Sequence, residues 1–329
     1  MASIASPNND AENNALTRDL LPMTYFANGY VAKSAGASFI MVSGTESIDF
    51  LQSILTANVA TIAVGGCRPA ALLTPQGRIL IDMMLYRLSD QDICIQTDQE
   101  RKDDLLTRLR RYRLRRPVIL EQSLDIHLTL WWGYEGMAKP DNDSIFLDPR
   151  HADLGCRIIS NSADLPPTLN GAKPASYENW QARRIRQAIP EGAIDLVPER
   201  ALMLEAGLDK LAAVDFEKGC YIGQEVTART HYRGLVKRRL LPICCEGPPP
   251  AIGSEIIWQD KMIATSKTAA ACPDNVGHSV ALALLKLSDI HAILDQATPT
   301  SASDLVINGH AARLCPPAWC LPLPLPPQR

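Results

Sequence analysis

The chain has 329 residues, of which 46% are hydrophobic and 21% charged, and its formal net charge is −3. This length suits two or three domains, and the composition is that of an ordinary globular protein. The small net charge argues against a protein whose whole surface binds nucleic acid, so we expect no direct DNA binding. No apolar run approaches the ~18 residues that a membrane-spanning helix needs, so we expect no membrane span.

Nine cysteines, an odd number, are scattered along the chain, and no two of them form a Cys-x-x-Cys motif. This spacing predicts neither a disulfide framework nor a zinc ribbon, and so many free thiols are typical of a reducing compartment. The first twenty residues contain three acidic residues and no apolar core, unlike a secretory signal or an Arg-rich transit peptide. We therefore expect a disordered tail over residues 1–22 and a cytoplasmic protein.

Residues 23–127 predict a first α+β lobe in which strands alternate with helices. Strands are expected over 30–43, 70–74, 79–88 and 93–96. A helix is expected from Thr45 or Ser47, and a second one over residues 99–112 with Asp98 as its cap. The stretch from Arg101 to Arg116 has eight basic residues and two acidic ones. This charge pattern fits a solvated helix face or a docking surface for an anionic partner.

Residues 128–236 predict a second α+β lobe. Its strands are expected over 128–132 and 145–147, and Ser176 is placed to cap a helix that Pro190 ends. Over residues 237–312, five short apolar segments separated by Gly, Pro and Asn predict a small β-barrel or sandwich. Residues 313–329 are rich in proline and predict an extended tail.

The segment Phe216-Glu217-Lys218-Gly219-Cys220-Tyr221-Ile222-Gly223-Gln224-Glu225 stands apart from the rest of the chain. Gly219 permits a close approach to Cys220, and a helix predicted from Gly223 to Tyr232 places Cys220 just before its N-terminus. Exposed N–H groups there, together with Lys218, would favour the thiolate. Glu225 and Arg229 are four residues apart and could pair on one helix face. A buried structural cysteine at this turn is the alternative.

This run, KGCYIGQE, resembles the hallmark of the YgfZ-type folate-binding proteins, which assist iron–sulfur cluster assembly and are relatives of the glycine-cleavage T-protein, an aminomethyltransferase. Other stretches are similar to the same family and span about residues 39 to 310. They are GTESIDFLQSILTANV from Gly44, LTPQGRILIDMMLY from Leu73, Asp148-Pro149-Arg150 with Leu154-Gly155-Cys156-Arg157, and Arg184-Ile185 with Ile189-Pro190-Glu191.

The resemblance implies a three-lobed ring with ferredoxin-like α+β lobes and a C-terminal β-barrel, and a central hole that binds tetrahydrofolate or a derivative. It makes Cys220 and Lys218 the candidate chemical pair. The remaining candidate motif residues are Gly219, Tyr221, Gly223, Gln224, Glu225 and Arg229. By position, Asp82 corresponds to an acid that the T-protein uses against the pterin, and Arg184 to an arginine of its RLEAG segment.

Three functions remain open at this point. The first is an accessory factor for [4Fe–4S] proteins, linked in bacteria to tRNA thiomodification, with iron–sulfur client or assembly proteins as partners. The second is a folate-dependent aminomethyl or one-carbon transferase, which is weakened because Ile81 replaces one of the T-protein's paired acids and because the Glu and Gly after Arg184 are missing. The third is an interaction module without chemistry. The histidines lie far apart, and Cys244 and Cys245 are adjacent on a strand, so no metal site is predicted.

Overall fold

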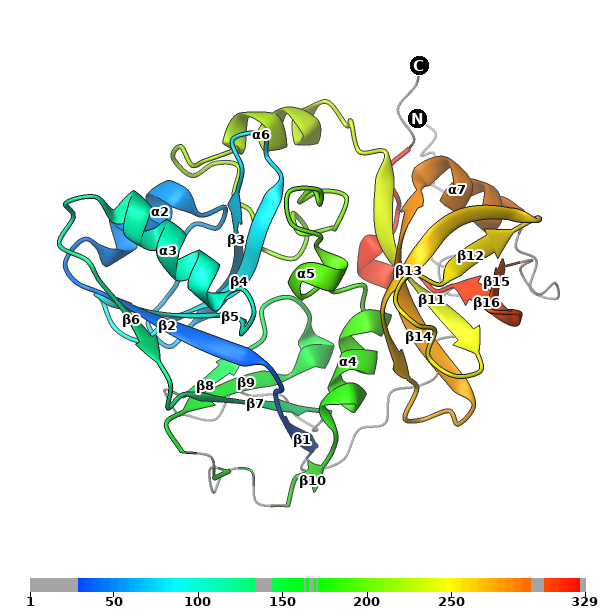
Figure 1. Ribbon diagram of the computed structural model, residues 1–329, viewed down its shortest axis with the longest axis horizontal. Helices are drawn as coiled ribbons and strands as arrows, with labels where there is room; N and C mark the ends of the chain where they lie inside the picture. Colours follow the sequence, from blue (N-terminus) through cyan, green and yellow to red (C-terminus); the bar gives the residue numbers. More distant parts are fainter. Residues whose placement is uncertain are drawn as a thin grey trace, which may run out of the picture.

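The computed structural model describes residues 29–133, 144–162, 164–165, 169, 171–296 and 305–325. The described chain forms two five-stranded sheets and one closed barrel, which surround a central region of short helices and loops (Figure 1). The expected class, α+β lobes with a C-terminal β-barrel, is confirmed. The tail predicted over residues 1–22 lies outside the described residues.

The first sheet has the strand order β3-β4-β5-β2-β6. The strands are β2 (Ala37–Ser43), β3 (Cys67–Leu73), β4 (Ile79–Arg87), β5 (Asp92–Asp98) and β6 (Ile119–Ser123). Two helices, α2 (Ser47–Ile54) and α3 (Lys102–Arg113), cover one face. Apolar residues at helical spacing bury this face, among them Phe50, Leu51 and Ile54 of α2 and Leu105 and Leu109 of α3.

The second sheet has the order β10-β1-β7-β9-β8. The strands are β1 (Tyr30–Lys33), β7 (His127–Trp132), β8 (Ile145–Leu147), β9 (Cys156–Ser160) and β10 (Lys173–Pro174). Strand β1 was expected in the first lobe, but it pairs with β7, from Tyr30 with Trp132 to Lys33 with Thr129. The pairing is long-range, and a local hydrophobic pattern does not specify which sheet a strand joins.

Helix α4 (Tyr177–Arg186) packs between the second sheet and the barrel, and it begins where the sequence predicted. Ser176 accepts a hydrogen bond from the backbone of Asn179, whose side chain bonds back to Ser176 in a capping box. The prediction of the helix over 223–232 is also correct, because α6 covers Gln224–Tyr232 with Gly223 as its N-cap.

The C-terminal unit is a closed barrel with the order β11-β14-β13-β12-β15-β16. Its strands are β11 (Arg238–Glu246), β12 (Glu255–Trp258), β13 (Lys261–Ala271), β14 (His278–Lys286), β15 (Leu305–Ile307) and β16 (His310–Leu314). It has six strands rather than the predicted five, and a helix, α7 (Leu287–Gln296), lies between β14 and β15. The sixth strand closes the barrel by pairing with β11, which leaves no free edge.

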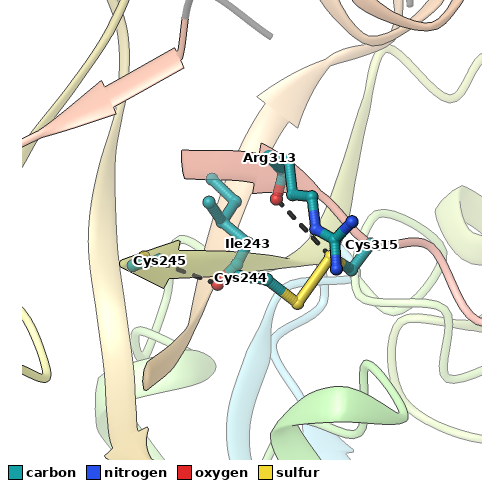
Figure 2. The surroundings of a disulfide bond; sticks show 5 residues. All are labelled: Ile243, Cys244, Cys245, Arg313 and Cys315. Atoms are coloured by element: carbon teal, nitrogen blue, oxygen red, sulfur yellow. Dashed lines mark hydrogen bonds between the residues drawn. A yellow bond between two sulfur atoms is a disulfide. The ribbon is translucent and has the colours of Figure 1, made fainter. Parts of the chain in front are cut away.

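The segment after the barrel packs against the protein instead of extending away as a tail. Cys244 and Cys315 form a disulfide (Figure 2), because the pairing of β11 with β16 brings their Cα atoms to 6.2 Å. A short helix, η3 (Ala318–Cys320), follows, and the indole N–H of Trp319 donates to the carbonyl of Gln187 at 2.9 Å. The expectation of unpaired cysteines is therefore wrong for these two positions.

Candidate functional site

The loop that precedes Cys220 is fastened to the segment that follows α2. Thr56 donates its hydroxyl to the carbonyl of Ala213 at 2.6 Å, and the amide of Asp215 donates to the carbonyl of Thr56 at 3.0 Å. The Asp215 carboxylate then accepts from the amides of Glu217 and Lys218 and from the side chain of Asn58. The bonds made by Thr56 and Asn58 join residues far apart in sequence, so the segment after α2 fixes the start of the motif.

Lys218 is a buried anchor of this loop. Its ammonium donates to the carbonyls of Leu55 and Ala57, both at 2.7 Å, and lies 5.2 Å from the ring centre of Tyr221. Burial lowers the pKa of this ammonium to about 8, although the negative charge of Asp215 acts to raise it. Because two carbonyls engage the ammonium, its observed contacts are those of a positioning residue.

Cys220 differs from every other cysteine of the chain in its exposure. All nine cysteines are described, and Cys220 is the one that is exposed. The seven free thiols include five buried ones and a half-buried one, Cys67, which donates to the carbonyl of Leu147. Burial raises the pKa of Cys67 and Cys94 to about 12. The exposure that the sequence predicted for Cys220 is present, and burial keeps the neutral thiol at those competing positions.

The second half of the motif turns into α6 on the first lobe. Gly223 has a φ of +81°, and a Cβ at this position would lie 2.5 Å from the carbonyl oxygen of Thr74, so only glycine fits. Ile222 packs against the core of the first sheet, and the side chain of Gln224 donates to the carbonyl of Lys218 at 3.4 Å. Glu225 and Arg229 are both exposed and form no ion pair with each other in this described part of the chain.

A cavity lies between the two sheets, and Asp82 lines it. Residues from β3, β4, β5 and β9 and from the 190–213 segment line it. Asp82 accepts a hydrogen bond from the amide of Gly192 at 3.0 Å. Burial raises the pKa of this carboxyl above its ordinary value, and the charge of Glu191 adds to the effect.

A second carboxyl group, which the sequence placed elsewhere, lines the same cavity. Asp98 was expected to cap a helix, but α3 begins at Lys102 without a side-chain cap, and Asp98 lies against Gly192 instead. A Cβ on Gly192, whose φ is +74°, would collide with this carboxylate. Burial, followed by the charges of Asp82 and Glu191, raises the pKa of Asp98 to about 7. Carboxyl groups this close hold a proton at higher pH than isolated ones.

Arg184, the other residue predicted to bind folate, does not line this cavity. It is fully buried, and its guanidinium donates to the carbonyl of Ile189 and to Asp195, both at 2.8 Å, and to Gln181. These partners hold α4 against the turn that leads to α5 (Gly192–Asp195). The structure therefore brings Asp82 to the cavity but leaves Arg184 behind its wall.

Two other arginines occupy the cavity wall. Arg150 bonds to Asp148 through two donors and to Glu191 at 3.0 Å, and Arg157 donates to Asp148, Tyr86 and Gln96. Burial acts to raise the pKa of Asp148, but the charges of these two arginines outweigh burial and lower that pKa to about 2. The DPR, LGCR and IPE stretches contain these residues, so those motifs were the available signal for them.

Two family models match the chain. The model described as the GCVT N-terminal domain matches residues 35–129, and the model of the CAF17 C-terminal beta-barrel domain matches residues 237–321. A crystal structure of the glycine cleavage system aminomethyltransferase T from Bartonella henselae superposes with a TM-score of 0.63 at 16% identity, covering 84% of this chain and 81% of that chain. This likeness shows that the fold is GcvT-like.

Curated relatives are mitochondrial iron–sulfur cluster assembly factors named IBA57. The factor of Mus musculus is 31% identical over 296 residues, covering 82% of this chain and 81% of the relative. The human factor is 32% identical over 241 residues, covering 66% and 67%. The homologue of Pyricularia oryzae is 32% identical over 216 residues, covering 62% and 54%, so the chain spans little more than half of this fungal relative.

These relatives change two of the expectations drawn from the sequence. The prediction of a cytoplasmic protein is wrong, because the relatives are named as mitochondrial. The fold is the one that the resemblance to the YgfZ type implied, but the relatives described above are IBA57 factors and not the bacterial YgfZ type. No helix in the described ranges is long and apolar enough to cross a membrane. By the identity and coverage of the mouse relative, the chain belongs to the family of the IBA57 iron–sulfur cluster assembly factors.

Proposed function

We propose that this protein is an accessory factor for the assembly or repair of [4Fe–4S] proteins, that Cys220 is its chemical group, and that a reduced folate binds beside Asp82. One observation carries the proposal. Cys220 alone among nine cysteines is exposed, and it stands on a loop that Lys218 and Asp215 fasten to the first lobe. An exposed thiol at a fixed position can ligate iron, carry sulfur or exchange with a partner thiol.

The cavity has groups that suit the pterin end of a folate. Carboxylate oxygens accept hydrogen bonds from the pterin amino and ring N–H groups, and Asp82 and Asp98 supply them. Met83, Met84 and Leu196 give apolar walls for a flat ring. Arg150 and Arg157 are already paired within the protein, so the fit concerns the pterin and not the glutamate end.

Complementation tests the role of Cys220. In Neurospora crassa cells that lack their own relative, expression of this protein in mitochondria should restore the activity of a [4Fe–4S] enzyme such as aconitase, and Cys220→Ala should not. The matched control is Cys67→Ala, which removes the half-buried thiol and should restore activity like the wild type. Full rescue by Cys220→Ala would refute the cysteine mechanism. In bacteria that lack a YgfZ-type relative, the same pair of variants should separate in the level of thiomodified tRNA.

Calorimetry with tetrahydrofolate tests the cavity independently. Asp82→Ala should weaken binding by about 1.5–3 kcal/mol, the size of a hydrogen bond to a charged group. Asp90→Ala is the control, because the side chain of Asp90 is almost fully exposed. Equal affinity of the Asp82→Ala variant and the wild type would remove Asp82 from the site.

A folate-dependent one-carbon transferase is the second candidate, and Asp98 favours it. The sequence lacks the second acid beside Asp82, but β5 supplies a carboxyl group to the same cavity. Purified protein can be incubated with an aminomethyl donor and tetrahydrofolate, and the formation of methylenetetrahydrofolate followed. Transfer that disappears in Asp98→Asn would establish this candidate, and no transfer above the uncatalysed rate would exclude it.

A further inference from the structure

An arginine cluster surrounds the C-terminal end of α3. Between Leu105 and Val118 the chain has six arginines and no acidic residue. Arg108 pairs with Asp104 at 2.7 Å. The other five, which we call the arginine cluster, are Arg110, Arg111, Arg113, Arg115 and Arg116. Figure 1 shows α3 and β6 on the side of the molecule opposite the barrel.

The protein itself leaves this charge largely unpaired. Arg113 donates to the carbonyl of Val118 at 3.1 Å. The side chains of Arg110, Arg111, Arg115 and Arg116 form no hydrogen bond or ion pair with any described residue. Arginines in the last turn stabilise a helix through its dipole, but Arg115 and Arg116 lie beyond the end of α3. Their mutual repulsion lowers the stability of the free protein, and an anionic partner would relieve it.

Two exposed apolar side chains lie in or next to this segment of the sequence. Leu114 is 80% exposed and has a φ of +54°, a backbone conformation in which glycine would be less strained. Ile119 is 56% exposed and begins β6, the edge strand of the first sheet. Leu114 stands between Arg113 and Arg115 in the sequence, and Ile119 follows Arg116 by three residues, so a partner bound at the cluster would also meet apolar surface.

We propose that the arginine cluster, with Leu114 and Ile119, is a docking surface for a protein partner that presents an acidic face with apolar side chains. A nucleic acid fits less well, because Tyr112, the aromatic residue of this segment, packs against the core of the first sheet and the whole chain is negatively charged. A lipid surface fits less well, because two isolated apolar side chains give little area for insertion. Carboxylates pair bidentately with arginine, and Leu114 and Ile119 add an apolar contact that phosphates do not offer. This surface does not involve Cys220 or the cavity.

Binding of a labelled peptide built of glutamate and leucine to the full chain tests the assignment. The charge-reversal variant Arg110→Glu/Arg111→Glu/Arg115→Glu should lose about tenfold or more in affinity, because three exposed pairs become repulsions. The matched control Lys237→Glu/Lys261→Glu/Lys286→Glu changes the net charge equally at exposed positions elsewhere and should bind as the wild type does. Leu114→Ser should weaken binding and leave its salt dependence unchanged.

Further measurements separate this proposal from its alternatives. Arginines in the last turn also stabilise α3, so a second variant changes only residues beyond the helix. Arg115→Glu/Arg116→Glu should lose affinity for the peptide to a smaller extent. Its circular dichroism spectrum should stay that of the wild type. Equal binding by the charge-reversal variant and the lysine control would overturn the docking surface. Tighter, cluster-dependent binding of single-stranded polyuridylate, or of vesicles containing phosphatidylglycerol, would overturn the choice of an acidic protein.

Discussion

Lys218 and Cys220 stand two positions apart, but their surroundings give them different roles. The Lys218 side chain points into the first lobe, where two carbonyls bind its ammonium, and Cys220 stays at the surface. A lysine with these partners fixes the backbone on which the thiol is carried. The sequence grouped the two residues as a chemical pair, and at the residue scale their burial divides them into an anchor and a reactive group.

Thiol labelling at neutral pH should modify Cys220 before any other cysteine. The reason is steric access together with the raised pKa of buried thiols such as Cys94 and Cys320. Mass spectrometry after brief treatment with iodoacetamide should locate the first label on Cys220. A first label on Cys67 would contradict the exposure that the structure shows.

Asp98 should make stability depend on pH. The ordinary pKa of the carboxyl is 3.8, and in the folded protein it is about 7. The folded state therefore holds the proton more tightly, and the free energy of unfolding falls as pH rises through this interval. The Asp98→Asn side chain does not titrate, so this loss is absent in the variant. Between pH 4 and pH 8 the free energy of unfolding should therefore fall by about 1–2 kcal/mol less in the variant than in the wild type. The value is reduced because the site is partly open to water. Urea unfolding at the two pH values measures it, and Glu121→Gln, an exposed change, should give no such difference.

At the scale of elements, the cysteine loop and the β3–β4 hairpin are built against each other. Gly223 meets the carbonyl of Thr74, and Gly77 of the hairpin turn lies against the carbonyl of Gly223 and the side chain of Thr227. Two glycines with positive φ allow this approach, because neither brings a side chain to the contact. The start of α6 is thus set by a turn nearly 150 residues earlier in the chain.

Gly223→Ala and Gly219→Ala form a matched pair of variants for this contact. The first adds a methyl group at a positive φ and against a carbonyl, so it should cost about 2–3 kcal/mol in the free energy of unfolding. The second adds the same methyl group where nothing lies within 4 Å, and it should cost less than about 1 kcal/mol. Thermal unfolding of both variants measures the difference, and similar costs would argue against the close approach.

At the scale of the whole molecule, a buried polar network joins the two sheets. Arg157 comes from β9 of the second sheet and donates to Tyr86 and Gln96 of the first, both at 2.7 Å. It also pairs with Asp148 at 3.0 Å, and Trp180 of α4 lies under its guanidinium. The cavity wall and the interface between the lobes therefore consist of the same side chains.

Arg157→Met should destabilise the whole protein, because it leaves buried acceptors without their donor. Breaking a buried ion pair on one side costs about 3–5 kcal/mol. Arg111→Met is the control, since that side chain is exposed and the change should cost less than about 0.5 kcal/mol. Denaturant unfolding monitored by tryptophan fluorescence compares the two, and an equally small effect of both would show that the network does not hold the lobes together.

The sequence alone determined the features that depend on neighbouring residues. Helix α4 with its Ser176 cap, the β3–β4 hairpin, the α6 helix after Gly223 and the motif around Cys220 follow from local spacing and capping chemistry. The resemblance to a known family, supported by short motifs, gave the fold class, which the structure confirms.

Only the tertiary structure decided which of these local pieces meet. In the structure β1 pairs within the second sheet, and Asp98 lines the cavity instead of capping a helix. Arg184 forms a buried ion pair with Asp195, and Cys244 is bonded to Cys315. Each of these outcomes depends on strand pairing or packing between residues distant in sequence. Local propensity and spacing do not specify such contacts, because they arise from the burial of whole sheet faces and from the satisfaction of buried polar groups.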